Sequence, residues 1–188
     1  MARPRSVPPP PDAAALRAAA LRYVARYAAH SGRLRRVLTT RLHKAALLHP
    51  DWARDTARHA VLKQEIERIV QSFAEKQYFN DAVFAASKAR AMHRQGKSGR
   101  AVAVQLRTEG LTPEQIAQAL SVAQEGQDEA ATELAAARRL AQRKHLGPYR
   151  KGAADAAQIR KDYATFARAG FSSAIARQVL GAPLDEDD

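Results

Sequence analysis

Apolar residues along most of this chain recur at intervals of three and four, which is the period of an α-helix with one buried face. Leu34, Val37, Leu38 and Leu42 are one example of this spacing. The chain has few runs of β-branched or aromatic residues and no sustained alternation of apolar and polar positions, so strands are not expected. The pattern predicts an all-α protein of about nine helices, arranged in three sets of three.

The first set begins after Asp12, a residue type that favours the N-cap position, with a helix over about 13–29. Its expected inward face comprises Leu16, Ala20, Tyr23, Val24 and Tyr27. Ser31-Gly32 ends that helix, and a second helix starts near Arg33. After Pro50-Asp51, a third helix is expected over 52–73, with an inward face made mostly of Trp52, Ala60, Val61, Ile66, Ile69, Val70 and Phe73.

The second set starts with a helix that Asn80 or Asp81 can cap and that runs to about Arg94. After a loop at 95–99, another helix runs to Thr108. Thr112, Pro113 and Gln115 then combine an N-cap hydroxyl, an N1 proline and the N3 partner of a capping box, which predicts a helix start. The third set is expected at about 128–145, 154–168 and 172–180, the last helix being capped by Ser172.

One short block occurs twice in the chain. Gly110 and Gly170 are each followed by an apolar residue, then by a hydroxyl residue, and ten residues after the glycine by a leucine. Because a repeated helical unit must stack on its neighbours to bury its apolar face, we expect three tandem three-helix repeats forming an elongated, curved helical rod. The repeats are predicted at 12–74, 75–126 and 127–181, between a disordered proline-rich basic arm at 1–11 and an acidic tail at 182–188.

The positive charge of the chain is concentrated in its first half. The formal net charge is +12, yet residues 1–100 carry 20 Lys and Arg against 7 Asp and Glu, and residues 101–188 carry 11 against 12. Such an uneven distribution favours binding to an anionic partner such as nucleic acid or an acidic protein surface. The alternative interpretation is a basic surface that faces only solvent.

Sixteen cations are candidate contacts for this partner. The densest group lies on the second predicted helix, where five cations fall within twelve residues. For the four cations that precede His145, capping of a helix C-terminus is an equally good explanation. Arg150 can be a contact or simply a turn residue. The candidates are Arg22, Arg26, Arg33, Arg35, Arg36, Arg41, Lys44, Arg94, Lys97, Arg100, Arg107, Arg138, Arg139, Arg143, Lys144 and Arg150.

Gly96-Lys97-Ser98 resembles the end of a phosphate-binding P-loop, but Ala91 stands where that motif needs its first glycine and no strand precedes it. We interpret it as a loop between helices. Lys97 and Arg100, near a helix N-terminus, are placed to meet a phosphate or carboxylate of a partner.

The sequence shows none of the residue patterns that are typical of catalytic sites or metal sites. There is no cysteine, the six histidines have no metal-ligand spacing, and no pairing of acids or serine–base pair suggests catalysis. No apolar run approaches the ~18 residues of a membrane span, and no signal peptide is evident. We therefore expect a non-enzymatic, cytoplasmic monomer without cofactors, bound to no membrane.

Residues 76–181 resemble the RecX regulatory proteins, which modulate the recombinase RecA. The resemblance is carried by short motifs in matching order: Tyr78-Phe-Asn-Asp81 with Phe84-Ala85, Gly96-Lys97-Ser98, Leu106 through Gly110-Leu111 to Leu120, Gly147-Pro-Tyr-Arg150, and Arg168-Ala-Gly170-Phe171-Ser172. Residues 31–38 are similar to the family's first repeat, but Ala45-Ala46-Leu47 replaces the expected glycine.

The resemblance implies a regulator that lodges along the groove of the RecA–DNA filament. Such a protein would inhibit ATP hydrolysis, filament extension and strand exchange, and so modulate homologous recombination, DNA repair and the SOS response. Single- or double-stranded DNA is also an implied partner. The alternative is a helix-turn-helix-like DNA- or RNA-binding protein that acts without RecA. Against it, the predicted helices after Gly110 and Gly170, which would have to read the bases, contain only one Lys or Arg, Arg177.

Overall fold

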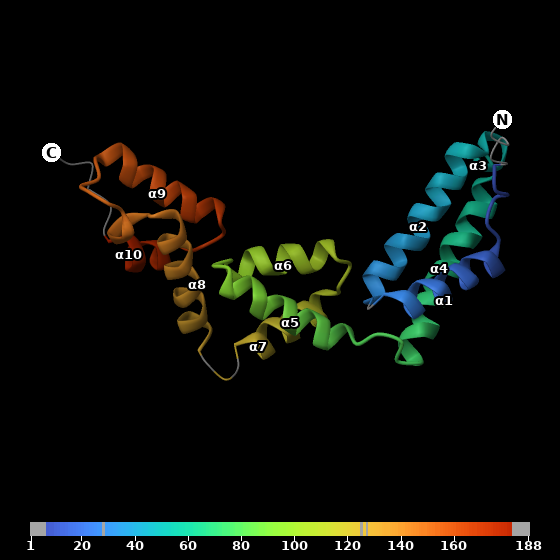
Figure 1. Ribbon diagram of the computed structural model, residues 1–188, viewed down its shortest axis with the longest axis horizontal. Helices are drawn as coiled ribbons and strands as arrows, with labels where there is room; N and C mark the ends of the chain where they lie inside the picture. The colour runs from blue at the N-terminus through green and yellow to red at the C-terminus, as the bar shows by residue number, and fades with distance from the viewer. Residues whose placement is uncertain (1–6, 28, 125, 127, 182–188) are drawn as a thin grey trace, which may run out of the picture. The chain divides into compact units, whose positions relative to one another are not determined.

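The computed structural model describes residues 7–27, 29–124, 126 and 128–181. These residues form ten α-helices and one short 3-10 helix, with no β-strand among them. The all-helical fold class predicted from the sequence is therefore confirmed. The chain divides into two compact units, Met1–Asp81 and Ala82–Asp188, which run from blue to green and from green to red in Figure 1.

The first unit contains α1 (Ala13–Arg26), α2 (Ser31–Leu48), the short α3 (Pro50–Ala53) and α4 (Thr56–Glu75). Helices α1, α2 and α4 pack around one cluster of buried apolar side chains, among them Leu16, Leu34, Leu38, Ile66 and Phe73. Each fully buried leucine of this kind contributes about 1.5–3 kcal/mol of transfer free energy. This burial along one face, rather than helix propensity alone, stabilises the three helices together.

Each long helix of the first unit has an N-cap, but not always the predicted one. The carboxylate of Asp12 accepts a hydrogen bond from the backbone N–H of Ala15 at 2.7 Å, as expected. The N-cap of α2 is His30, so Ser31 and Gly32 belong to the helix and do not interrupt it. Of Asn80 and Asp81, the two residues predicted as the cap of the next helix, Asp81 is the first residue of that helix and accepts hydrogen bonds from the backbone N–H of Ser31, at 2.9 Å, and from its hydroxyl.

The helix predicted over 52–73 is two helices. Asp55 caps α4 by accepting a hydrogen bond from the backbone N–H of Arg58 at 2.9 Å, which separates α4 from α3. The buried face of α4 also differs from the predicted one in the N-terminal part of the helix. Leu62 is buried, whereas Val61, predicted to face inward, is 59% exposed. Both residues are apolar, and only the packing of α4 against α2 decides between them.

The second unit contains the helices α5 (Asp81–Arg94), α6 (Gly99–Thr108), α7 (Pro113–Ala123), α8 (Glu129–Lys144), α9 (Ala156–Arg168) and α10 (Ser173–Leu180). Its buried side chains form two clusters, one from α5–α7 around Val102 and Leu106, the other from α8–α10 around Leu140 and Phe166. The division into three repeats, the repeat boundaries and the rod remain predictions.

The predicted starts of α7 and α10 and the predicted glycine stops of α6 and α9 are confirmed. Thr112 and Gln115 form a reciprocal capping box at α7, and Ser172 caps α10. Gly110 and Gly170 follow α6 and α9 with φ angles of 88° and 86°, a left-handed conformation that glycine adopts without a Cβ penalty. The repeated glycine block is thus a repeated helix C-terminus followed by a helix N-terminus.

Candidate anion-binding groove

A groove of about 1060 Å³ lies in the first unit, bounded by α1, α2 and the segment Pro8–Pro11. Ala15, Ala19 and Val37 contribute apolar surface to it, and one acidic residue, Asp12, is part of its lining. Six of the sixteen predicted contact residues line this groove: Arg22, Arg26, Arg33, Arg36, Arg41 and Lys44. The structure thus brings together residues that the sequence places on two separate helices.

The spacing of the cations along the two helices explains why they share the groove. Arg33, Arg36, Arg41 and Lys44 recur about once per turn on one face of α2, and they extend over roughly 16 Å of its axis at 1.5 Å per residue. Arg22 and Arg26 are one turn apart on α1. All six residues are exposed. Cations at this density repel one another, and a bound polyanion relieves that repulsion.

The segment Pro8–Pro11 forms part of the groove wall. Pro11 is buried, and the backbone oxygen of Pro8 lies 2.8 Å from Nε2 of His49, which follows the C-terminal end of α2. This part of the predicted disordered arm therefore packs against the helices, while residues 1–6 lie outside the described part of the chain, as does the predicted acidic tail at 182–188. The sequence indicated no such contact, because Pro8 and His49 are 41 residues apart.

Arg35 does not line the groove. Its Nε lies 2.8 and 2.9 Å from the two carboxylate oxygens of Glu67 on α4, so its side chain bridges the two helices. The prediction that groups Arg35 with its neighbours on α2 is corrected in this respect. The two residues are 32 positions apart in the sequence, and only the packing of α2 on α4 brings them together.

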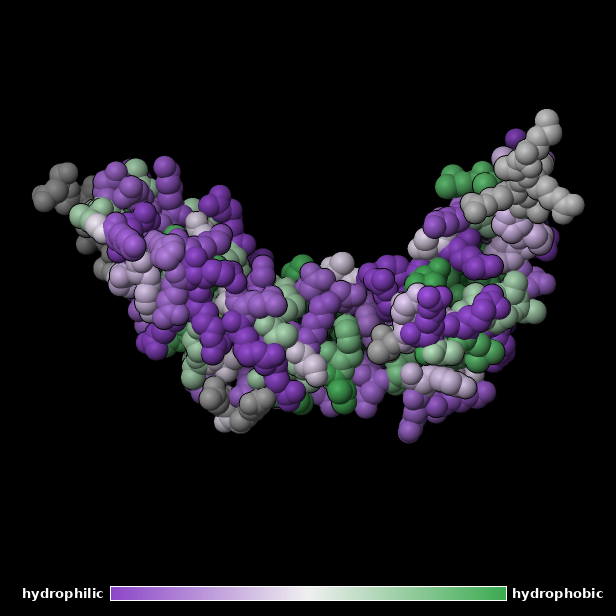
Figure 2. Space-filling view, viewed as in Figure 1, coloured by the Kyte–Doolittle hydropathy of each residue, from purple (hydrophilic) through white to green (hydrophobic). Residues whose placement is uncertain are grey.

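Apolar side chains are exposed close to the groove. Figure 2 shows hydrophobic side chains beside hydrophilic ones at the end of the first unit where α2 meets α3. Leu47 and Leu48 in this region are 81% and 52% exposed, and Leu48 lines the groove. Tyr27, predicted to face the core, is 49% exposed and also lines the groove. The groove therefore combines cations with open apolar and aromatic surface.

Two of the predicted contact residues on α8 also reach backbone carbonyl groups of the same unit. Nη1 of Arg139 lies 3.4 Å from the backbone oxygen of His93, and Nη1 of Arg143 donates to the backbone oxygen of Gln95. Both acceptors lie at the C-terminal end of α5, where carbonyl groups lack helical partners and the helix dipole favours cations. The expected alternative is capping at the C-terminus of their own helix, whereas the carbonyl groups that these two arginines reach belong to the end of α5. All four cations, Arg138, Arg139, Arg143 and Lys144, are exposed.

The Gly96-Lys97-Ser98 segment joins the two halves of the second unit. Ser98 is fully buried, and its hydroxyl donates to the backbone oxygen of Ala169 at 2.6 Å while accepting from the backbone N–H of Ala101 at 3.1 Å. A Cβ atom on Gly96 would lie 2.8 Å from the backbone nitrogen of Leu140. The segment therefore connects α5 to α6 and packs against α8 and the end of α9, which agrees with its interpretation as a loop between helices.

The predicted anion site at the N-terminus of α6 already holds a carboxylate of the same chain. Oε2 of Glu133, on α8, accepts a hydrogen bond from the backbone N–H of Gly99 at 2.9 Å. Burial raises the pKa of Glu133 above its ordinary value of 4.5, and the hydrogen bond from Gly99 opposes this shift. Lys97 and Arg100 are exposed beside this contact. Arg94 on α5 and Arg107 on α6 are also exposed.

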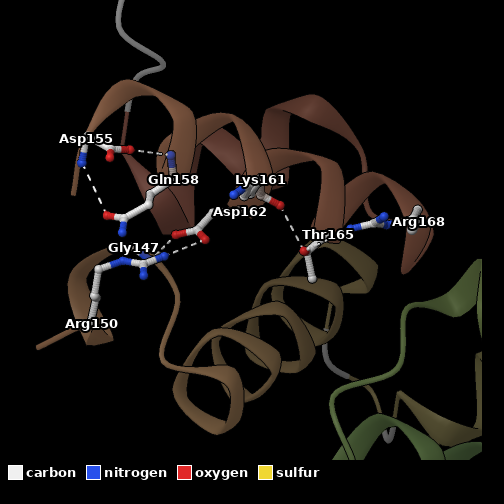
Figure 3. Close-up of polar contacts among 8 residues, drawn as sticks. All are labelled: Gly147, Arg150, Asp155, Gln158, Lys161, Asp162, Thr165 and Arg168. Carbon is white, nitrogen blue, oxygen red and sulfur yellow. Dashed lines mark hydrogen bonds and ion pairs between the residues drawn. The ribbon is translucent and has the colours of Figure 1, made fainter.

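Arg150 belongs to a polar cluster in the second unit, which Figure 3 shows. Its Nη2 lies 2.7 Å from Oδ1 of Asp162, a carboxylate that is 6% exposed, and Oδ2 of Asp162 accepts from the backbone N–H of Gly147 at 2.8 Å. This carboxylate holds the turn between α8 and α9 against α9. Arg150 thus takes part in an ion pair within the chain, and its contact with a partner remains a prediction.

The described residues contain no group of three or more His, Asp or Glu side chains placed to hold a metal ion. Among the same residues, no helix is long and apolar enough to cross a membrane. The described part of the first unit does offer a basic groove with a mixed apolar lining. Such a surface can bind an extended anion and position it.

Comparisons with known proteins find two similarities. Residues 80–120 match the family model of the second three-helix domain of RecX. The chain is also 34% identical, over 179 residues, to the regulatory protein RecX of Myxococcus xanthus (strain DK1622), a match that covers 95% of this chain and 88% of that protein. The family match includes α5, α6 and most of α7, and the longer alignment extends the similarity over both units.

Proposed function

This chain belongs to the RecX family of regulatory proteins, and from that premise we propose that it regulates the RecA filament by binding to it. It would do so without an enzymatic reaction and without a cofactor. Its partners would be the RecA filament and the DNA within it, and it would act as a cytoplasmic monomer. The membership of the family carries the regulatory role, and the groove supports the manner of binding.

The observation that supports the manner of binding is the groove of the first unit. Six cations and one carboxylate line it, so its field is strongly positive. A RecA filament presents two kinds of anion to such a surface, the phosphates of its DNA and carboxylates on its protein. Clefts lined by charge of one sign raise the local concentration of an oppositely charged partner and the rate of its association.

Binding of this helical protein along the filament would restrict the movements of the filament. A regulator that bridges successive RecA subunits would oppose the subunit movements that accompany ATP turnover, because a ligand shifts an equilibrium by its differential affinity for the two states. We therefore expect lower ATPase activity, slower filament extension and less strand exchange. Homologous recombination, DNA repair and the SOS response would be modulated as a consequence.

The DNA-dependent ATPase of RecA tests this proposal. RecA filaments are formed on single-stranded DNA and titrated with the protein, from far below one molecule per RecA subunit to equimolar amounts. We expect the ATPase rate to fall well below stoichiometric amounts, since each bound molecule would affect several subunits. An unchanged rate at equimolar protein would contradict the proposal.

The alternative is a nucleic-acid-binding protein that acts without RecA, and the same groove favours it. However, neither helix that follows a repeated glycine is suited to base reading, because α7 carries no Lys or Arg and α10 carries only Arg177. A sequence-specific footprint on duplex DNA in the absence of RecA would support this alternative. Equal affinity for all duplex sequences, together with inhibition of RecA, would count against it.

A further inference from the structure

We propose that the groove of the first unit binds single-stranded nucleic acid, with Tyr27 as a base-stacking residue and the cations of α1 and α2 as phosphate contacts. The inference rests on the proposed function, because it names the component of the filament complex that this groove contacts. It goes further in choosing among anions. The groove would recognise a strand with accessible bases, rather than a duplex or an acidic protein surface.

Tyr27 is the first observation behind this choice. It is the C-cap residue of α1, and its extended backbone, with φ of −130° and ψ of 134°, turns the chain out of the helix. The residue lines the groove and is 49% exposed, although a tyrosine gains free energy when its ring is buried. An aromatic ring held open within a cluster of cations is the combination that single-strand-binding proteins use.

The neighbours of Tyr27 hold its ring in place. The ring of Tyr23, one turn earlier, lies 5.0 Å away between centroids at an interplanar angle of 38°. The guanidinium carbon of Arg26 lies 5.6 Å from the centroid of the Tyr27 ring. Tyr23 is itself fixed, because its hydroxyl accepts a hydrogen bond from Nε of Arg33 at 3.2 Å. A pre-positioned ring loses little conformational entropy when a base stacks on it.

The cations supply the second requirement of a single-strand site. They lie on two sides of the groove, with Arg22 and Arg26 on α1 and the others distributed over about 16 Å of α2, so a strand between the helices meets cations along its course. The carboxylates of an acidic protein segment would use these cations equally well but would not stack on an exposed aromatic ring, as a base does. A nucleic acid strand uses both, which decides between the two partners.

The groove wall argues against a duplex. Pro8–Pro11 forms one side of the groove and is tied to the end of α2 through His49, so the groove is bounded on three sides. The bases of a duplex are stacked on each other and paired, and their faces are not available to a side chain in such a groove. A single strand can turn a base face towards Tyr27 while its phosphates remain on the arginines.

The test measures binding without RecA. Fluorescence anisotropy follows labelled oligo-dT of about 20 nucleotides, an abasic strand of equal length and a duplex, each with the wild-type protein and with three variants. Tyr27→Ala should weaken oligo-dT binding about 5- to 100-fold, the range for loss of a stacked base, and should leave binding of the abasic strand unchanged. Tyr27→Phe should stay within about twofold of wild type, since its ring is retained. Tyr78→Ala is the matched control, because Tyr78 is 50% exposed and lies outside the groove.

Three results would overturn the inference: oligo-dT binding by Tyr27→Ala equal to that of the wild type, equal affinity of the wild type for the abasic strand and for oligo-dT, or displacement of oligo-dT by polyglutamate as effectively as by unlabelled oligo-dT. Circular dichroism of each variant verifies that the helices are intact. A protein that inhibits RecA and yet gives any of these results loses only this inference. A protein that binds oligo-dT through Tyr27 but leaves the RecA ATPase unchanged loses only the proposed function.

Discussion

Gly96 is a residue at which the backbone of this protein tolerates little change. Its φ angle is 73°, and a Cβ atom there would lie 2.8 Å from the nitrogen of Leu140 and 3.1 Å from the oxygen of Ala136. Both neighbours are backbone atoms of α8 and cannot move away independently of the helix. Two separate penalties therefore apply to any other residue, the left-handed conformation and the clash.

Gly96→Ala is expected to lower the free energy of unfolding by about 2–4 kcal/mol, the sum of left-handed strain and overpacking. The matched control is Gly152→Ala, because Gly152 has a φ angle of 89° and nothing within 4 Å of an added Cβ. It should cost only the conformational part, about 1–2 kcal/mol. Urea denaturation measures both values. Equal losses for the two variants would show that α8 does not approach Gly96 this closely.

Glu133 predicts a pH dependence. Because its pKa is raised in the folded protein, the folded state binds the proton more tightly than the unfolded state does. The resulting stabilisation is fully present below the ordinary pKa of 4.5 and is lost as the pH rises through the folded-state value. Glu133→Gln keeps an oxygen that can accept from Gly99 and removes this titration.

We therefore expect the midpoint temperature of Glu133→Gln to equal or exceed that of the wild type at pH 7. The difference should shrink, or change in favour of the wild type, between pH 7 and pH 4. Differential scanning calorimetry of both proteins at several pH values provides the comparison. A difference that is constant over this range would mean that Glu133 has the same pKa in both states.

At the scale of elements, local signals predicted most helix boundaries, and the errors have two origins. Asp12, Thr112 and Ser172 were readable as caps because a cap bonds to a residue only three positions away. The split between α3 and α4 rests on a cap of the same local kind, Asp55 to Arg58, which the prediction overlooked. The choice between Val61 and Leu62, in contrast, depends on packing against α2, and no pattern within residues 52–73 decides it.

The same distinction applies to the candidate contacts. The sequence identified all six cations of the groove, since a dense basic face is visible in the pattern alone. It did not identify the partners of Arg35, Arg139, Arg143 and Arg150, which lie between 12 and 48 positions away. Glu133 and the wall formed by Pro8–Pro11 were missed for the same reason.

The turn between α8 and α9 depends on the buried carboxylate of Asp162. Asp162→Ala should lower the free energy of unfolding by about 2–4 kcal/mol, because it leaves the Arg150 guanidinium and the Gly147 N–H without their acceptor. Asp128→Ala is a matched control, since Asp128 is exposed and its side chain makes no capping hydrogen bond. That control should change stability by no more than about 0.5 kcal/mol. Similar values for the two variants would contradict the structural role of Asp162.

At the scale of the whole molecule, the binding prediction concerns the first unit, which contains the groove. The groove with its six cations lies in the first unit, whereas several cations of the second unit are bound to its own carbonyl and carboxylate groups. We expect binding of single strands to depend on salt, with a slope of log K against log[salt] no steeper than about −4 for six released counterions. A fluorescence titration from 50 to 300 mM NaCl measures this slope, and a value near zero would contradict phosphate contact.

The most direct test of the central claim, that the protein regulates RecA through this groove, compares two triple variants in the RecA ATPase assay. Arg22→Ala/Arg41→Ala/Lys44→Ala removes three cations from the groove, and Arg17→Ala/Arg58→Ala/Lys63→Ala removes the same residue types from exposed positions of the same unit outside the groove. The groove variant should require at least about tenfold more protein for half-maximal inhibition, a loss of about 1.4 kcal/mol, while the control should stay within about twofold of wild type. Equal inhibition by the two variants would contradict the account.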